Sequence, residues 1–277
     1  MSTNRPEIIA ETNLSYAWGK AFLRMMGPDS THAPITLSVE AFTPKGLPIE
    51  DPVIRNATDA ALKAHGLLPV TNTAYTIFPN DAWEFQKQPP HEKFAPGFRK
   101  WIFPFMYRAH RGNRTGTYFQ RMVAFGADID KQGHLSPAHV DQPAKILAFW
   151  RGAGSHRRSA LQMACFDPHR DHHGKARSGF PCLQQVSLSY DSQHEGLAIT
   201  GYYPSEFIFD RGYGNYLGLC HLGRYMAKNM GLHLIRMNCV IAHPLLGGEG
   251  VSKTPLRPLE KLIRNQIAAA EAAAAVA

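Results

Sequence analysis

Cysteine is scarce in this sequence, which has four of them in 277 residues. Cys165, Cys182, Cys220 and Cys239 show none of the short paired spacings that zinc-binding motifs use. A chain of this length can fold around an apolar core without disulfide bonds. The sequence therefore argues against a disulfide-stabilised scaffold and against a zinc module. Each cysteine is first interpreted as a small packed residue and only then as a reactive thiol.

Long apolar runs and clusters of basic residues are also missing. A typical apolar run, Ile146–Trp150, is too short to cross a bilayer, and Met1–Glu11 lacks the apolar stretch of a secretory signal. We therefore expect a cytoplasmic protein that does not enter a membrane. The net charge of +8 favours an anionic ligand, but no run of five or more basic residues occurs. Scattered basic residues favour local phosphate contacts over a polynucleotide groove, so nucleic acid is not the expected partner.

No internal repeat and no low-complexity linker before residue 260 divides the chain. Strands that alternate apolar and polar residues, joined in hairpins and followed by long helices, predict an α+β fold. Expected helices cover 16–26, 51–65, 143–150 and 216–229, and expected strands cover 35–39, 118–125, 161–166, 186–190 and 197–203. We expect 1–110 to be an N-terminal extension packed on the core, 111–258 to be the core, and 259–277 to be a helical, fraying tail.

The segment from Phe94 to His110 is dense in aromatic residues, and Arg99, Lys100 and Arg108 are interleaved with them. Such a segment could stack the bases of a nucleic acid. A helix that buries its aromatic residues in the core is the more frequent structure for such a composition, and it is the one we expect.

Three short motifs follow one another in the second half of the chain. In Arg114–Thr117 a glycine lets the backbone approach an anion, which the arginine can bind through two parallel hydrogen bonds. Phe166–Pro168 is followed by a polar loop and Phe180–Cys182, which places a cysteine between a loop and a strand. Asn215, after a glycine at a helix start, offers a donor and acceptors to a polar ring, and it is also a good helix N-cap.

In order and spacing these motifs resemble the thymidylate synthases and related pyrimidine hydroxymethylases, over about half of the chain, from residue 111 to about 245. The resemblance implies a single-domain mixed sheet with flanking helices, in a homodimer. It implies that the Cys182 thiolate adds to C6 of a pyrimidine nucleotide, after which C5 attacks the methylene group of methylenetetrahydrofolate and becomes methylated or hydroxymethylated. The thiol would need a lowered pKa, and a neighbouring arginine would help.

The chain departs from the family pattern at several positions. The glutamate that organises proton transfer in the family falls at Lys145, and the family's Gln-Arg-Ser-x-Asp run keeps only Ser205. Arg211 could replace the lost phosphate arginine, while the family's ribose contacts and folate-closing tail have no clear counterpart. The expected catalytic residues are Cys182 and Asn215. The expected phosphate ligands are Arg114, Thr115, Arg157, Arg158, Ser205 and Arg211, of which Arg157 and Arg158 would reach across the dimer interface. The expected substrate pocket contains Lys145, Trp150, Asp167, Tyr203 and His243.

A crowded loop before Cys182 contains His169, Asp171, His172 and His173. Adjacent histidines in an extended loop point apart, which disfavours a shared metal ion. We expect no metal there and interpret the loop as solvated or facing the substrate.

Two further functions remain open at this point. An enzyme of the same fold could have lost folate and act on another heterocycle in nucleotide modification or secondary metabolism. A catalytically silent nucleotide- or nucleic-acid-binding protein would instead use the positive charge and the aromatic segment 94–110.

Overall fold

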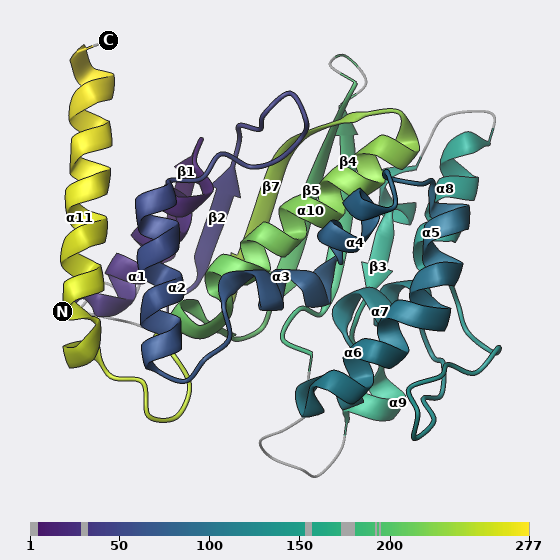
Figure 1. Ribbon diagram of the computed structural model, residues 1–277. Coiled ribbons are helices and arrows are strands. Elements are labelled where there is room, and N and C mark those ends of the chain that lie inside the picture. Colours follow the sequence, from purple (N-terminus) through teal and green to yellow (C-terminus); the bar gives the residue numbers. More distant parts are fainter. Residues whose placement is uncertain are drawn as a thin grey trace.

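The computed structural model describes residues 5–28, 33–152, 157–172, 181–191, 193 and 195–276. Its centre is a six-stranded mixed sheet with the order β1-β2-β7-β5-β4-β3 (Figure 1). The pairs β1–β2 and β5–β7 are parallel, and the other neighbours are antiparallel. Two short parallel strands, β6 and β8, form a second sheet. The strands are β1 (Glu7–Glu11), β2 (Ile35–Val39), β3 (Gln162–Ala164), β4 (Gln185–Asp191), β5 (Gly196–Tyr203), β6 (Glu206–Phe207), β7 (His233–Ile241) and β8 (Pro244–Leu245).

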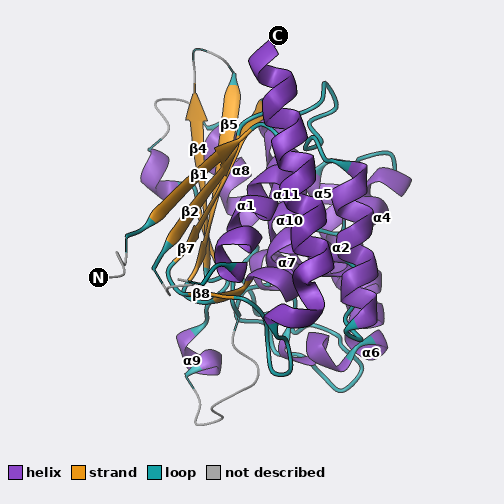
Figure 2. Cartoon of the chain, turned by 90° about the vertical axis from the view of Figure 1, so that its left-hand side faces the viewer, coloured by secondary structure: helices purple, strands orange, loops and turns teal. Residues whose placement is uncertain are grey.

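Helices cover one face of the large sheet (Figure 2). Regular α-helices are α1 (Leu14–Met26), α2 (Pro52–Ala64), α3 (Val70–Ile77), α4 (Asn80–Phe85), α5 (His91–Gly97), α6 (Phe103–Ala109), α7 (Tyr118–Val123), α8 (Gln142–Arg151), α9 (Pro168–Asp171), α10 (Tyr213–Met230) and α11 (Lys253–Val276). Short 3-10 and π-helical turns are η1 (Phe98–Ile102), η2 (Arg111–Thr115), η3 (Arg158–Ala160) and η4 (Ile208–Gly212).

The long strands bury one face against these helices. On β2 the buried Ile35, Leu37 and Val39 alternate with the half-buried Thr36 and Ser38, and β4, β5 and β7 show a similar alternation. Successive side chains of a strand point to opposite faces, so every second residue enters the core. The α+β prediction is thereby confirmed as a mixed sheet with flanking helices.

α10 lies along the middle of the covered face and packs closely on α3 (Figure 1). A Cβ added at Gly214 would lie 2.6 Å from the Thr73 Cβ. One added at Gly218 would lie 2.8 Å from the Ile77 Cβ. A larger residue at either position would push the helices apart. The close approach holds the first turn of α10, which carries Asn215, beside α3.

Residues 118–123 form α7 and not the strand that was predicted for 118–125. The Thr117 hydroxyl caps the helix by accepting the N–H of Gln120 at 3.3 Å, and Phe125 makes only an isolated bridge with Val140. All residues from 119 to 123 are buried. A continuous buried run has no alternation, so the apolar pattern alone does not separate a strand from a core helix.

The aromatic segment 94–110 consists of α5, the π-helical turn η1 and α6, and therefore is not one regular helix. Phe94, Phe98 and Phe103 are buried in the core, as expected for a core helix. Trp101 and Phe105, by contrast, are 68% and 67% exposed. The segment thus has a buried aromatic side and an exposed aromatic side.

The C-terminal helix α11 begins at Lys253, ahead of the predicted tail, and extends to Val276. Leu256, Ile263 and Ile267 are buried where α11 packs on α1 and α2. Neither α11 nor any other helix in the described part of the chain is long and apolar enough to span a membrane.

Candidate active site

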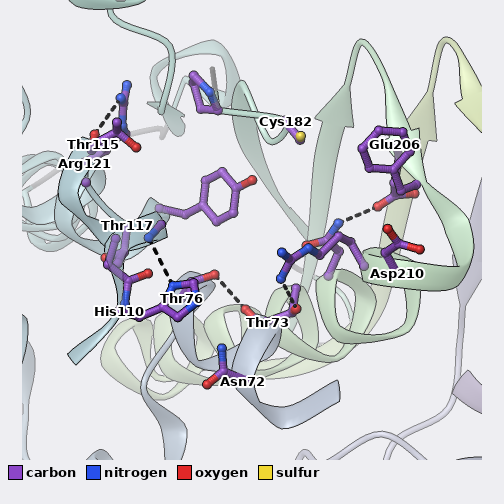
Figure 3. A pocket seen from close by; sticks show the side chains of 18 residues that line it. Asn72, Thr73, Thr76, His110, Thr115, Thr117, Arg121, Cys182, Glu206 and Asp210 are labelled. Atoms are coloured by element: carbon purple, nitrogen blue, oxygen red, sulfur yellow. Dashed lines mark hydrogen bonds between the residues drawn. The ribbon is translucent and has the colours of Figure 1, made fainter. Parts of the chain in front are cut away.

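A cavity of about 370 Å³ lies where segments far apart in the sequence meet. α3 forms one wall, η2 and the start of α7 form a second, and β6, η4 and the first turn of α10 form a third. Pro181 and Cys182, which precede β4, complete the lining (Figure 3). The volume falls within the range of about 300–1,000 Å³ that is typical of small-molecule sites.

The Cys182 thiol faces this cavity, whereas Cys165, Cys220 and Cys239 are buried. Burial is the largest influence on its pKa and raises it, and the negative charge of Glu206 raises it further. A hydrogen bond with the Tyr118 hydroxyl and the positive charge of Arg211 act in the opposite direction, but they do not outweigh burial. The pKa is therefore raised, not lowered as the resemblance implied, and the thiol of the free protein is protonated at neutral pH.

Asn215 projects from the first turn of α10 and is 2% exposed. Its Nδ2 donates a hydrogen bond of 2.7 Å to Oε1 of Glu206 (Figure 3). The second carboxyl oxygen, Oε2, accepts a bond of 2.8 Å from the Tyr216 hydroxyl. Asn215 is not the N-cap of α10, because η4 runs directly into the helix. Its amide is instead fixed at the cavity wall by a carboxyl group.

Glu206 is 1% exposed and reaches the cavity from β6. Burial raises its pKa to about 7, although the hydrogen bonds from Asn215 and Tyr216 act to lower it. Within the described chain, no Lys, Arg or His forms an ion pair with it. The carboxyl group therefore exchanges its proton in the physiological range, as a catalytic acid or base would.

Thr115–Thr117 of the Arg-Thr-Gly-Thr motif line the opposite wall. Gly116 has φ of +98°, and a Cβ there would lie 2.5 Å from Oε1 of Gln120, so only glycine fits this bend. The loop is held by Arg121, whose Nη2 donates to the Thr115 carbonyl at 2.9 Å while its guanidinium binds both oxygens of Asp171. Since Arg121 is neutralised by a carboxylate, it acts as a support for the loop.

Arg211 and Asp210 bring charge to the third wall. Nη1 of Arg211 donates to the Thr73 hydroxyl at 3.2 Å, and no carboxylate of the described residues forms an ion pair with it. Oδ2 of Asp210 accepts the N–H of Gly248 at 3.0 Å, whereas its buried Oδ1 has no partner in the described chain. The arginine can therefore bind an anionic group at this wall.

The other predicted phosphate ligands do not line this cavity. Arg114 is exposed beside the loop, and Ser205 is half-buried next to Glu206. Arg157 and Arg158 are exposed, and the Arg158 guanidinium stacks on Tyr190 at 4.5 Å. The predicted role of this pair lies across a dimer interface, which a single chain does not contain.

All five residues predicted for the substrate pocket also lie outside the lining of this cavity. Lys145 is exposed on α8, and Trp150 Nε1 donates to the Met230 carbonyl at 2.8 Å. Asp167 caps α9 by accepting the N–H of His169, and His243 is exposed. Tyr203 is fully buried behind the wall, where its hydroxyl has no hydrogen-bond partner in the described chain. These side chains are engaged in capping, packing or solvent exposure.

The histidine-rich loop gives no metal cluster in the part of the chain that the structure describes. Asp171 is bound to Arg121, and the His172 ring packs edge-on against Phe166 at 5.0 Å. His173 lies outside the described residues.

Glu206, Tyr118 and Asp210 were missed by the sequence analysis. Comparison with the family pattern drew attention to Ser205 and away from the carboxylate that follows it. A signal was nevertheless present, because Glu206 is the single charged residue in the apolar run 206–209. A charged group in a buried run needs specific partners or a function.

Neither the family models nor the curated proteins compared with this chain give a match.

Proposed function

We propose that this protein is a divergent enzyme of the thymidylate synthase type, which adds Cys182 to the ring of a pyrimidine nucleotide and transfers a one-carbon unit to C5. The observation that carries the proposal is convergence: Thr115, Cys182 and Asn215, one from each sequence motif, line one cavity. A thiol, an amide and a glycine-containing loop around one space suit covalent catalysis on a flat polar ring. The thymidylate synthase-like arrangement of the sheet and helices is part of the proposal.

Cys182 is the nucleophile in this scheme. Its sulfur bonds to C6, and the electron pair of the C5–C6 double bond moves toward C5 and the O4 carbonyl. C5 then bonds to the one-carbon unit and loses its own proton, and the thiolate leaves as the C5–C6 double bond is restored. Methylenetetrahydrofolate would supply the one-carbon unit. Covalent activation of this kind divides one difficult step into easier ones.

Asn215 and the two polar walls bind the nucleotide. One N–H of Asn215 is used by Glu206, which leaves its second N–H and its Oδ1 for O4 and N3 of the ring. Arg211 and the Thr115–Thr117 loop bind the phosphate from opposite walls.

The proposal includes a cytoplasmic homodimer in which Arg157 and Arg158 reach the phosphate of the partner's site. Both arginines are exposed and lie outside the cavity of their own chain, as that role requires. Arg157→Ala/Arg158→Ala protein should have a raised KM, and mixing it with inactive Cys182→Ser protein should restore the low KM in mixed dimers. A KM that stays raised under conditions of subunit exchange would remove the pair from the site.

A version of the proposal without folate is favoured by one observation. α11 packs on α1 and α2, so the C-terminal helix does not close over the cavity. Release of tritium from C5 of labelled nucleotides, measured with and without methylenetetrahydrofolate, separates the versions. Release that needs no folate supports an enzyme acting on another heterocycle by the same thiol addition.

Intact-protein mass spectrometry with a panel of 5-fluoropyrimidine nucleotides tests the central claim. We expect a covalent adduct that maps to Cys182 and is lost in Cys182→Ser. Lys145→Ala is the matched control, because this exposed residue lies away from the cavity. Unmodified protein with every nucleotide of the panel would contradict the proposal.

A second candidate function, binding of single-stranded nucleic acid, is favoured by the exposed side of the aromatic segment. Trp101 and Phe105 are four residues apart, more than two-thirds exposed, and Lys100 lies over the Trp101 ring at 4.7 Å. Residues 93–127 contain seven Lys and Arg residues and no Asp or Glu. Exposed aromatic rings beside basic side chains are typical of surfaces that stack bases.

Binding of a fluorescent oligonucleotide at several salt concentrations tests this candidate. We expect an affinity that falls steeply with salt and drops further in Trp101→Ala/Phe105→Ala. Binding that is equally strong in this variant would exclude the aromatic pair.

A further inference from the structure

Glu206 occupies an unusual position for a carboxyl group. It lies on the two-residue strand β6, where its backbone N–H donates to the His243 carbonyl at 3.2 Å. The side chain is almost completely buried, yet its only bonded partners in the described chain are the neutral groups of Asn215 and Tyr216. Burying a carboxylate without a cation is costly. A fold that keeps such a group at a cavity wall points to a chemical use.

The carboxyl group is coupled to the nucleophile. Glu206 and Cys182 line the same cavity, and the charge of Glu206 adds to burial in raising the pKa of the thiol. Two groups that interact in this way titrate as a pair, so the protonation state of one depends on that of the other. The Tyr118 hydroxyl, bonded to the thiol, contributes a polar group between the walls.

The titratable and charged groups around this pair come from several elements. They are Tyr216 of α10, Tyr203 of β5, Cys239 of β7, Tyr118 of α7, and Asp210 and Arg211 of η4. The pKa values of Tyr118, Tyr203, Tyr216 and Cys239 are all raised, chiefly by burial. These four groups stay neutral near pH 7, whereas the pKa of Glu206 is about 7.

We propose that Glu206 is the proton carrier of this site, taking the proton of Cys182 and delivering it to the carbonyl oxygen of the ring held by Asn215. The inference rests on the proposed function and names the residue that replaces the glutamate missing at position 145. The carboxyl group reaches the same ring edge from a different element, β6, through its contact with Asn215.

Each step of the transfer is balanced. The ionised carboxylate of Glu206 takes the thiol proton, which leaves a thiolate and a neutral carboxylic acid. The sulfur bonds to C6, the C5–C6 electron pair shifts toward O4, and Glu206 returns the proton to O4, which gives an enol. In the exchange reaction, C5 takes a solvent proton while the O4 proton returns to Glu206, which restores the carbonyl. C5 then loses its original proton to solvent, the sulfur leaves as a thiolate with restoration of the C5–C6 double bond, and Glu206 returns the proton to the sulfur. No oxidant, reductant or folate is consumed.

Two measurements on Glu206→Gln test the proposal. The first is alkylation of Cys182 by iodoacetamide as a function of pH, followed by intact mass, which needs no substrate. We expect the reactivity profile to move to lower pH, because the negative charge that opposes thiolate formation is gone. The second is release of tritium from C5, measured with and without methylenetetrahydrofolate, which we expect to slow by roughly 100-fold or more.

Two further variants distinguish a proton carrier from a residue that only positions Asn215. Tyr216→Phe keeps the carboxyl group but removes one hydrogen bond to its ionised form, so the pH profile of exchange should shift upward while the maximal rate is largely kept. Glu271→Gln, an exposed carboxylate on α11, is the matched control and should change neither measurement.

The outcomes are separable. An unchanged alkylation profile in Glu206→Gln, with or without slower exchange, overturns the proton-carrier role and leaves at most a positioning role. If the unmodified protein releases no tritium from any nucleotide, either with or without methylenetetrahydrofolate, the proposed function fails, and the alkylation profile alone still decides whether Glu206 controls the thiol proton.

Discussion

The cavity wall formed by β6 and the first turn of α10 contrasts with the edge region formed by α8 and residues 157–164. Both regions were expected to supply site residues. In the cavity wall, Glu206, Asn215 and Tyr216 are buried and bonded to one another. In the edge region, Lys145 is exposed and Trp150 is bonded to a backbone carbonyl.

The difference shows how a fold uses polar groups. A buried polar network is kept at a cost of desolvation, so it marks a place where geometry and charge are controlled. Exposed side chains carry no such cost and usually tolerate substitution. A match of residue type to a family motif therefore says less about where the site lies than burial of a polar group does, because that burial costs desolvation free energy.

The largest expected difference between the two regions concerns catalysis. Cys182→Ser should reduce C5 tritium release by roughly 1,000-fold or more, because the weaker nucleophile cannot add to the ring. Lys145→Ala in the edge region should leave the rate largely unchanged. A similar loss in both variants would break the comparison and place the edge region in the site.

Stability should also depend on pH differently in the two regions. The pKa of Glu206 is about 7 when folded against its usual 4.5, so the stability associated with its proton is present below pH 4.5 and is lost as pH rises to about 7. The loss amounts to about 3 kcal/mol. The glutamine side chain of the Glu206→Gln variant does not titrate. In urea unfolding, the free energy of unfolding of this variant relative to that of the unmodified protein should therefore rise by about this amount between pH 4.5 and about pH 7.

Glu92 provides the control for this measurement. It forms an exposed ion pair with Arg151 of α8, and a hydrogen bond from that arginine lowers its pKa. Glu92→Gln should change the free energy of unfolding by at most about 1 kcal/mol. If the free energy of unfolding depends on pH in the same way in the unmodified protein and in Glu206→Gln, the raised pKa of Glu206 is contradicted.

Asn215→Ala should lower kcat/KM for the preferred nucleotide by roughly 100-fold, because a ring edge and a carboxyl oxygen both lose a partner.

Trp150→Phe removes a hydrogen bond to Met230 in the edge region and should cost about 1 kcal/mol of stability without a change in kinetics. Steady-state kinetics and thermal unfolding on both variants measure the two effects. A kinetic defect in Trp150→Phe would sharpen the comparison by extending the site toward α8.

The smallest effect is expected for the phosphate contacts. Arg211→Ala should raise KM about tenfold, since one charge-assisted contact is lost. Arg158→Ala loses its stacking on Tyr190 and, in a homodimer, a contact to the partner's phosphate. The KM of Arg158→Ala should be measured together with the molecular mass of the protein in solution. A similar rise in KM in a dimeric protein would place Arg158 in the active site of the partner subunit.

Sequence patterns predicted much of the fold. The alternation in 35–39 and 186–190 and the helical spacing in 16–26 led to β2, β4 and α1 because period and burial agree locally. The prediction for 118–125 was wrong because a run buried on all sides carries no period. The exposure of Trp101 and Phe105 was equally beyond local patterns, since η1 rotates the helix surface between α5 and α6.

The chain by itself determined the chemical types available: a cysteine after a proline, an asparagine at an expected helix start, and a glycine with neighbouring threonines. Only the tertiary structure decided which of them meet and which carboxyl group joins them. Glu206 and Asn215 are nine residues apart and belong to different elements, so their bond depends on how β6 and α10 pack. The pKa of Glu206, about 7, likewise comes from the tertiary structure. Desolvation depends on how deeply the fold buries a carboxyl group, and the residue type alone does not determine that burial.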